Sequence, residues 1–395
     1  DLQRKLFEEM RKYIQEDDQS LPEKRGEYFY YTRTEVGKEY LVYCRKHKSL
    51  ENPEEILLNV NSEAEKHPFY RVSAFKVSPN HKLAAFVVDL DGSESYRLFI
   101  KDLKTGRILE EVTQTACTFL EWANDSTHLF YTVVDRSLRP YQLYRHALST
   151  SNQNDVLLYT ETDSAFFLQL DKTKDQAYLL MNLVNFTTTE VHYLQADEPE
   201  SEWHLFQERV PNLIYRIEHH LNRFMILSNY QDTNFCLLST AISQTDCAHW
   251  QLYYASQPGI KLEAMEVFKD FIALYEREMG LMHIRVIDIA TKQDARVPFS
   301  ESAYLVSQAP NPDFEADDFL FHYSSLVQPF STYRYQTKTQ EMSLVKQKAV
   351  PGYDPADYQS ERVWVEGKDG VKIPLSIVYK KSLRKTGPQA LHLYA

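Results

Sequence analysis

The densest group of side chains that could do chemistry lies in the segment DRSLRPYQLYRHAL, residues 135–148. It holds Arg136, Arg139, Arg145 and His146, in a chain whose formal net charge is −12. Basic groups crowded into one hairpin can line a channel or form ion pairs between domains, since perturbed charges gather at functional sites. A structural ion-pair network uses the same residue types, and we favour it over the channel or interdomain charge cluster.

Catalytic and metal-binding motifs are missing from the sequence. A nucleophile elbow needs a glycine two positions before its serine, and no glycine of this chain stands there. His219 and His220 are adjacent rather than three or four residues apart, so one helical face cannot present both to a metal. The cysteines are widely spaced and form no C-x-x-C pair: Cys44, Cys117, Cys236 and Cys247. The residues therefore indicate no catalytic group, no metal and no cofactor.

Charge and composition exclude several classes of partner. A net charge of −12 argues against nucleic acid as a partner, and no apolar run is long enough to span a membrane. Cysteines without a pairing pattern suit a reducing compartment, so we expect a cytoplasmic location. An acidic surface can attract basic peptides. The acidic stretches at 16–18, 197–202 and 317–318 are interpreted as solvated loops.

A repeat of strand-forming segments organises most of the chain. Each copy follows a turn, such as SPNHK (78–82) or NPDFEADD (311–318), and continues into a strand rich in aromatic and aliphatic residues. The seven anchor strands begin at positions spaced 46 to 55 residues apart: Tyr28, Leu83, Leu129, Tyr178, Phe224, Phe271 and Phe319. Four strands in each period of this length are typical of a propeller blade. We therefore predict an all-β fold, a seven-bladed β-propeller.

The N-terminal flank of the repeat predicts a short helix. Residues 1–16 place a row of apolar side chains on one face of an amphipathic helix, with Asp1 as its N-cap. The row consists of Leu2, Leu6, Met10, Tyr13 and Ile14. Such a face must pack on something, and the side of the propeller is one option.

The C-terminal flank predicts a strand in need of a partner. Residues 349–360 are interpreted as a linker, and Asp369-Gly370 as a tight turn. Beyond the turn, apolar residues recur at every second position, as in a half-buried strand. They are Val371, Ile373, Leu375, Ile377 and Tyr379.

Several strings of the sequence carry a resemblance to a known family. They are FLEWANDSTHLFYTVVDRSLRPYQLYRHALST (119–150), TTTEVHYLQAD (187–197), NFCLLST (234–240) and VPGYDPADYQSERVWVEGKDGVKIPLSIVYKK (350–381). In this order they resemble the N-terminal half of the prolyl oligopeptidase family of serine peptidases, most closely its oligopeptidase B branch. The resemblance implies a cytoplasmic peptidase built from a seven-bladed propeller and an α/β-hydrolase domain. This branch cuts short peptides after Lys or Arg.

The resemblance also implies a division of the chain. Residues 1–20 are expected to be a helix packing on the hydrolase side, and residues 21–350 the propeller. Residues 351–395 are expected to be a linker and the first strands of a truncated α/β-hydrolase domain. The two crossings between domains, which are expected to act as the interdomain hinge, fall at Leu21, Pro22, Pro351 and Gly352.

In this family the catalytic triad belongs to the hydrolase half, so the resemblance implies that this chain is inactive alone. The propeller is expected to act as a lid and size filter, with its own hydrolase domain and short, basic peptides as partners. Two alternatives stay open: a stand-alone propeller interaction module, and an oligopeptidase-like serine hydrolase acting on esters. An apolar strand left unpaired at residues 371–379 is aggregation-prone, which argues against the stand-alone module.

Overall fold

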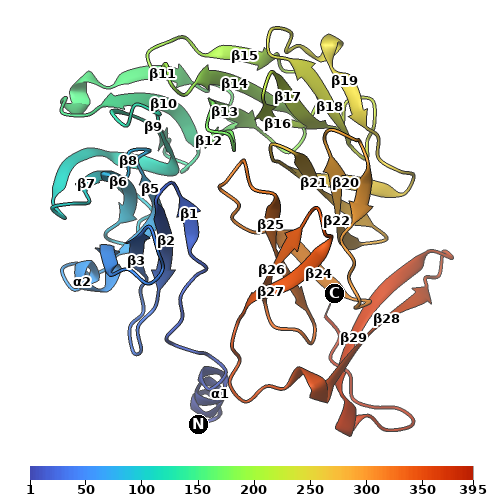
Figure 1. The fold of residues 1–395 in the computed structure, drawn as a ribbon. Coiled ribbons are helices and arrows are strands. Elements are labelled where there is room, and N and C mark those ends of the chain that lie inside the picture. Colours follow the sequence, from blue (N-terminus) through green and yellow to red (C-terminus); the bar gives the residue numbers. More distant parts are fainter. Residues whose placement is uncertain (395) are drawn as a thin grey trace.

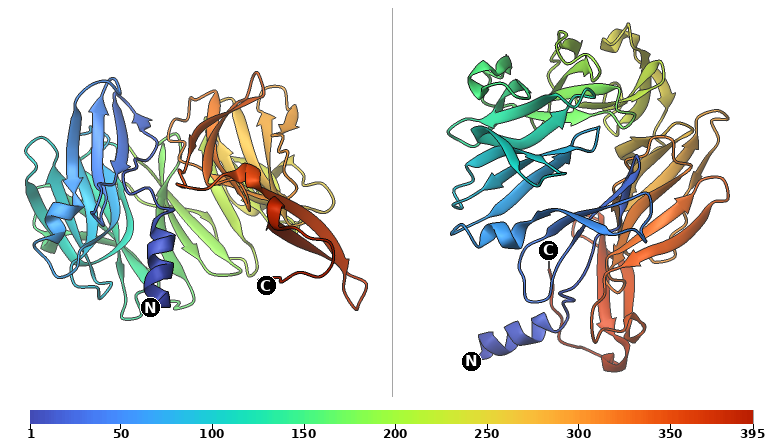
Figure 2. Two further views of the ribbon diagram at one scale, coloured as in Figure 1. Left: turned by 90° about the horizontal axis from the view of Figure 1, so that it is seen from below. Right: turned by 60° about the vertical axis from the view of Figure 1, so that its left-hand side comes forward.

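The structure, a computed structural model, is a ring of antiparallel β-sheets (Figure 1). It describes residues 1–394, and the side chains of all of these except Gln114, Cys117 and Thr118. The part of the sequence analysis that concerns Cys117 therefore lies outside the described side chains. A helix and a two-stranded hairpin stand outside the ring on one side (Figures 1 and 2).

The strands group into sheets in sequence order. The first sheet contains β1 (Glu23–Arg25), β2 (Tyr28–Arg33), β3 (Val42–His47) and β4 (Glu54–Asn59). The next contains β5 (Arg71–Val77), β6 (Leu83–Asp89), β7 (Tyr96–Asp102), β8 (Ile108–Trp122), β9 (His128–Val134), β10 (Pro140–Ala147) and β11 (Val156–Thr160). It is followed by β12 (Phe167–Lys172), β13 (Tyr178–Val184), β14 (Thr189–Gln195) and β15 (His204–Gln207).

Three further four-stranded sheets complete the ring. They are β16 (Tyr215–His220), β17 (Arg223–Ser228), β18 (Cys236–Ala241) and β19 (Gln251–Tyr254); β20 (Ile260–Val267), β21 (Phe271–Glu278), β22 (Leu281–Asp288) and β23 (Asp294–Arg296); and β24 (Tyr304–Gln308), β25 (Asp318–Ser325), β26 (Ser331–Gln336) and β27 (Glu341–Gln347). Outside the ring lie α1 (Leu2–Arg11), β28 (Tyr358–Glu366) and β29 (Lys372–Lys380), while α2 (Val60–Ala64) follows β4. None of the helices within residues 1–394 has the length and apolar character needed to span a membrane.

The predicted count of seven blades is wrong. Residues 1–394 form five separate four-stranded sheets in the ring, while the second and third repeats of the sequence are joined in one seven-stranded sheet. The join is β8, which runs unbroken from Ile108 to Trp122 and pairs with both β7 and β9. Its stretch VTQTACTFLEW, residues 112–122, contains no Gly, Pro, Asn or Asp to favour a turn. The chain therefore stays extended where the prediction placed a break between sheets.

All seven anchor strands are present, as β2, β6, β9, β13, β17, β21 and β25. Their side chains form the apolar layers between neighbouring sheets. Phe271 on β21 and Phe319 on β25, for example, pack with ring centroids 5.8 Å apart. Burying side chains of this size stabilises the fold by roughly 1.5–3 kcal/mol each. Packing between sheets, rather than any single sheet, therefore stabilises the ring.

The antiparallel order places the turns of the ring on two opposite faces. Because successive strands reverse direction, the turns between first and second strands share one face, which we call the far face. These turns are residues 26–27, 78–82, 123–127, 173–177, 221–222, 268–270 and 309–317. The turns between second and third strands share the other face with the two ends of the ring, and we call it the linker face. These turns are residues 34–41, 90–95, 135–139, 185–188, 229–235, 279–280 and 326–330.

Helix α1 is shorter than predicted and does not rest on the ring. The Asp1 side chain caps it by accepting from the N–H of Gln3, as expected, but the helix ends at Arg11 rather than near residue 16. None of its residues is buried. Its apolar row is therefore exposed, and the side of the propeller does not cover it.

The predicted C-terminal strand is β29, and β28 is its partner, with Trp364 opposite Pro374. The hairpin touches the ring where Arg362 donates to the carbonyl of Met279 on the linker face. Val371 and Ile373 at the start of the predicted strand are exposed. The predicted strand thus has its hydrogen-bonded partner, β28, within this chain. The apolar side chains at its start are left exposed to solvent.

Candidate functional site: the seam and the far mouth

The first and last sheets meet at a seam that differs from the other junctions of the ring. Elsewhere neighbouring sheets share apolar clusters, such as that of Phe271 with Phe319 or that of Leu58 with Phe86. Among the described side chains, no hydrophobic cluster joins β1–β4 to β24–β27. A cavity of about 720 Å³ lies there instead. The ring is therefore not closed by apolar packing at this junction.

The N-terminal segment enters the ring through the seam (Figure 1). It is bound to the first sheet, since the N–H of Ser20 donates to the Thr32 carbonyl (2.7 Å) and that of Thr34 to the Asp18 carbonyl (2.8 Å). From the last sheet, Lys346 reaches across to Asp18, with its Nζ 2.7 Å from Oδ1. The entering segment thus belongs to the first sheet, and an exposed ion pair connects it to the last.

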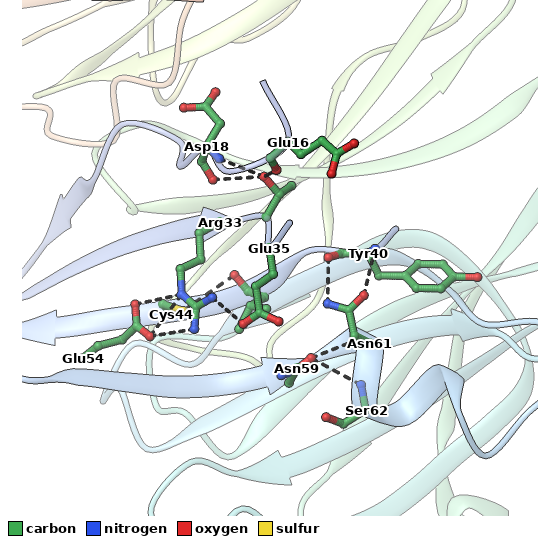
Figure 3. A network of polar contacts seen from close by, with 12 residues as sticks. Glu16, Asp18, Arg33, Glu35, Tyr40, Cys44, Glu54, Asn59, Asn61 and Ser62 are labelled. Atoms are coloured by element: carbon green, nitrogen blue, oxygen red, sulfur yellow. Dashed lines mark hydrogen bonds and ion pairs between the residues drawn. The ribbon is translucent and has the colours of Figure 1, made fainter. Parts of the chain in front are cut away.

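A polar network stiffens the first-sheet wall of the seam (Figure 3). Arg33 binds Glu54 and Glu35, with shortest distances of 3.0 and 2.6 Å, and the Tyr31 hydroxyl donates to Glu54 (2.6 Å). Burial opposes ionisation of Glu54, but the hydrogen bonds from Arg33 and Tyr31 outweigh it and lower the pKa of Glu54. Burial also raises the pKa of the Cys44 thiol to about 12, so this thiol is unreactive. The network is structural rather than catalytic.

The four residues predicted as the hinge lie at the two ends of the ring. Leu21 and Pro22 line the seam cavity. Pro351 and Gly352 follow β27, and the φ of +76° at Gly352 favours glycine there. The next residue, Tyr353, donates its hydroxyl to the carbonyl of Val327 at 2.6 Å, which fixes the exit of the chain on the linker face. Their hinge role stays a prediction.

The arginines predicted to form a charge cluster have separate surroundings. Arg136 is exposed, whereas Arg139 is buried and donates to Asp135 Oδ2 and to the carbonyl of Phe166, both at 2.9 Å. Arg145 is half-buried and donates to the carbonyl of Pro199 at 2.8 Å. The structure therefore gives these arginines different partners.

His146, the fourth member, is only 1% exposed and lies between two carboxylates. Its Nε2 is 2.6 Å from Glu110 and its Nδ1 is 2.7 Å from Asp155. Both partners belong to the seven-stranded sheet or its turns. A channel or interdomain role for the cluster stays a prediction.

A second cavity, of about 810 Å³, opens at the centre of the far face. Its walls include Lys24, Lys76, Glu121 and Lys172, which lie on the first strands of neighbouring repeats, and part of turn 309–317. First strands surround the centre of the ring, so this cavity is one end of its central channel. We call it the far mouth.

Glu218 on β16 lies beside the far mouth, where it accepts from the backbone N–H of Lys174 at 3.1 Å. Burial raises the pKa of Glu218 to about 7, against the smaller opposing effects of this hydrogen bond and of the Lys174 charge. The carboxylates of Asp175 and Asp171 add to the rise. The charge of this part of the channel therefore changes near neutral pH.

Replacing Glu218 with glutamine is expected to stabilise the chain near pH 8 and to have little effect near pH 4. The folded state holds the Glu218 proton up to a pKa of about 7, compared with 4.5 ordinarily, so stability falls as pH rises through this window. At about 1.4 kcal/mol for each pKa unit, the gain near pH 8 is about 3 kcal/mol. Unfolding followed across this pH range measures it.

Glu278→Gln is the matched control for this pH dependence. The hydrogen bond from Arg296 lowers the pKa of Glu278, so its contribution is present above the ordinary pKa and is lost on acidification. This variant should therefore lose stability near pH 8, opposite in sign to Glu218→Gln. A loss of stability in Glu218→Gln near pH 8 would contradict the assignment.

Sequence reasoning missed the pair formed by Lys174 and Glu266, which are 92 residues apart in the chain and whose Nζ and Oε2 atoms are 3.0 Å apart. Neither residue belongs to a motif. The segment NPDFEADD (311–318), whose Asn311 binds both residues, is longer than the other predicted turns, and this length was the available signal of additional contacts. Pairs of this kind depend on how the sheets are arranged around the ring.

The described residues contain no group of His, Cys, Asp and Glu side chains that could hold a metal ion. His219 and His220, considered for this role in the sequence, have separate partners. The Nδ1 of His219 is 2.5 Å from Asp175, and the Nε2 of His220 is 2.8 Å from the carbonyl of Lys269.

Comparison with known proteins finds relatives that are named as peptidases. The chain is 29% identical to Protease 2 of Moraxella lacunata over 98% of its length, and 30% identical to dipeptidyl aminopeptidase BI of Pseudoxanthomonas mexicana over 100%. In both cases it spans 57% of the relative's own length. Among solved structures, oligopeptidase B from Leishmania major matches with a TM-score of 0.91 at 29% identity, over 98% of this chain and 57% of that chain.

The family assignment rests on a match that covers most of the ring. The family model of the prolyl oligopeptidase N-terminal β-propeller domain matches residues 1–348, from α1 to the end of β27. The chain belongs to this family.

Proposed function

We propose that this chain is the non-catalytic propeller part of a serine oligopeptidase, in which it serves as the lid and size filter of an α/β-hydrolase domain. Residues 1–20 and 351–395 form the connections to that domain, and residues 21–350 form the propeller. The family match ends at residue 348, which supports the boundary after residue 350. The relatives named above are peptidases by name, and the chain spans 57% of their length.

The observation that carries the proposal is an apolar linker face. Turns on this face expose large apolar side chains, of which Phe186 is 99% exposed. The set is Val36, Leu41, Leu138, Phe186, Met279, Leu326 and Phe330. Among the described residues, the turns of the far face expose Leu221 and, between β3 and β4, Leu50. Clustered apolar exposure marks a contact surface, so a domain placed over the linker face accounts for the difference between the two faces.

The same domain accounts for the exposed apolar side chains of α1 and of the β28–β29 hairpin, which stand beside the ring. A ring over a catalytic domain admits chains that fit its openings and excludes folded proteins. The seam cavity, at about 720 Å³, is in the range of sites that hold small ligands or short peptide segments. The net charge of −12 favours basic peptides, which supports cleavage after Lys or Arg.

The test compares this chain alone with the full product of its gene. The substrates are a short peptide with one Arg, the same peptide with Gln in its place, and the same segment inside a folded protein. We expect the full product to cleave the short Arg peptide but neither of the other two substrates. We expect this chain by itself to show no turnover above buffer.

Each alternative outcome contradicts a different part of the proposal. Hydrolysis by this chain alone contradicts the non-catalytic role. Equal cleavage of the Arg and Gln peptides contradicts the preference for basic residues. Comparable kcat/KM for the folded protein contradicts the size filter, and a full product without hydrolytic activity contradicts the peptidase assignment.

A further inference from the structure

The turn between β24 and β25, residues 309–317, is the longest of the turns between first and second strands. Other turns between first and second strands are shorter, such as 221–222 and 268–270. Residues 309–317 contact the sheets of β12–β15, β16–β19 and β20–β23, through Lys174, His220 and Glu266. Chain length beyond what a reversal requires calls for a separate physical role.

The base of this turn is fixed by one side chain. Asn311 Nδ2 donates to the carbonyls of Ala309 (3.0 Å) and Leu320 (2.9 Å), and its Oδ1 accepts from the N–H of Leu320 (2.7 Å). These bonds join the two arms of the turn where it leaves the sheet. The base is therefore rigid.

A buried ion pair ties the base to the sheets of β12–β15 and β20–β23. Lys174 Nζ donates to Glu266 Oε2 (3.0 Å) and to the carbonyl of Asn311 (2.8 Å), and the Asn311 amide donates to the same Glu266 oxygen (3.0 Å). The side chains of Lys174 and Glu266 are 12% and 7% exposed. The Lys174 ammonium also lies 4.1 Å from the centre of the Phe268 ring. Removal of either partner leaves an uncompensated charge, so this anchor is strong.

The tip of the turn is held by weaker contacts. The N–H of Lys269 donates to the Phe314 carbonyl (2.9 Å), and Lys269 Nζ pairs with Glu315 (3.1 Å) at an exposed position. The Phe314 ring packs against His220 with centroids 5.9 Å apart. Exposed ion pairs of this type contribute about 1 kcal/mol or less. The tip can therefore detach while the base stays in place.

The tip also lies over the centre of the far face. Pro312, Asp313, Phe314 and Glu315 line the far mouth together with the first strands of the opposite sheets. We propose that residues 309–317 form a strap that closes the far mouth of the central channel against large molecules. The strap does not depend on the proposed peptidase function, because it concerns access to the ring alone.

A cysteine inside the ring can report on the strap. Asp171 on β12 is exposed, and the charges of Lys76 on β5 and Arg216 on β16 act on it, which places it among the first strands around the channel. Asp171→Cys in the 395-residue chain is treated either with iodoacetamide or with a maleimide on a long polymer. Mass spectrometry of the peptide that contains residue 171 separates this reaction from that of the native cysteines.

Two strap variants and one control are compared in the Asp171→Cys background. Replacement of residues 313–316 by two glycines shortens the strap, Phe314→Ser loosens its tip, and Leu221→Ser changes an exposed side chain in another far-face turn. We expect the polymer reagent to react at least about tenfold faster in the shortened variant and at least about threefold faster in Phe314→Ser, since reaction follows the open population. The polymer rate should be unchanged in Leu221→Ser, and the iodoacetamide rate should be unchanged in every variant.

Two outcomes overturn the strap. One is an unchanged polymer rate in both strap variants. The other is a parent in which the ratio of the polymer rate to the iodoacetamide rate equals the ratio measured for the same cysteine in the unfolded chain. If the shortened variant unfolds, iodoacetamide also becomes faster there, and Phe314→Ser then decides, because it keeps the length and the buried anchor of the turn.

Discussion

Replacing Arg285 with methionine is expected to lower the free energy of unfolding by about 3–5 kcal/mol, the effect of removing one partner of a buried ion pair. Arg285 on β22 is 7% exposed and Glu276 on β21 is 1% exposed. Nε donates to Oε1 at 2.5 Å and Nη2 to Oε2 at 3.2 Å. Arg285 also pairs with Asp294. Methionine keeps much of the volume but leaves the Glu276 carboxylate without its closest donor. Denaturant unfolding of the chain measures the loss.

Arg277→Met is the matched control on the neighbouring pair of strands, β20 and β21. Arg277 pairs with Glu263 at 2.8 Å, but its side chain is 46% exposed, so the loss should stay below about 1 kcal/mol. In Arg285→Met, Glu276 keeps Arg296, 3.0 Å away, as its remaining partner. The double variant Arg285→Met/Glu276→Gln should regain part of the loss, because a neutral amide is cheaper to bury than a carboxylate that has lost its closest donor. Similar losses for Arg285→Met and Arg277→Met would contradict the buried-pair explanation.

The anchor strands were predictable because their signal is local. A segment such as LAAFVVD, β6, has a composition that favours a strand whatever surrounds it, and the structure buries its residues 84–89. The cap at Asp1 has the same local origin, since its side chain reaches only two residues ahead. Features decided within a few residues therefore follow from sequence.

The number of separate sheets and the length of α1 depend on contacts between segments that are distant in the sequence. β8 continues across the expected break because each half of it has a partner strand, β7 or β9, and no turn residue interrupts it. Helix α1 stops at Arg11, and a few residues later the Glu16 carbonyl accepts from the Thr34 hydroxyl at 2.6 Å. Tertiary contacts of this kind override helical periodicity, and no window of the sequence contains both partners.

The candidate sites depend on contacts between distant segments. Lys346 and Asp18, which connect the two sides of the seam, are 328 residues apart, and a reading of either segment gives no reason to pair them. Leu21 and Pro22 were singled out from the family resemblance, but the cavity that they line is visible only in the assembled ring. No sequence motif marks ion pairs between distant segments of a ring. The far mouth and its strap therefore could not be predicted from the sequence.

Replacing His146 with glutamine is expected to lower the free energy of unfolding by about 3–5 kcal/mol near pH 6 and by clearly less near pH 9. Burial opposes the imidazolium charge, but the hydrogen bonds to Asp155 and Glu110 outweigh it and raise the pKa of His146. The folded state therefore holds this proton more tightly than the unfolded chain, whose histidines titrate near about 6.5. The stabilisation is complete below that value and is lost as pH rises through the folded pKa.

The surroundings of His146 make the pH comparison decisive. The Tyr131 hydroxyl donates to Asp155 at 2.7 Å and the N–H of Ser149 donates to Glu110 at 2.8 Å, so both carboxylates keep a donor when the imidazole is removed. His249→Gln is the control, because His249 pairs with an aspartate at 2.7 Å but is 46% exposed, and its loss should stay below about 1 kcal/mol. A loss for His146→Gln that is equal near pH 6 and pH 9 would mean that His146 is neutral in the fold. A loss confined to the acidic side requires the charged imidazole between its two carboxylates.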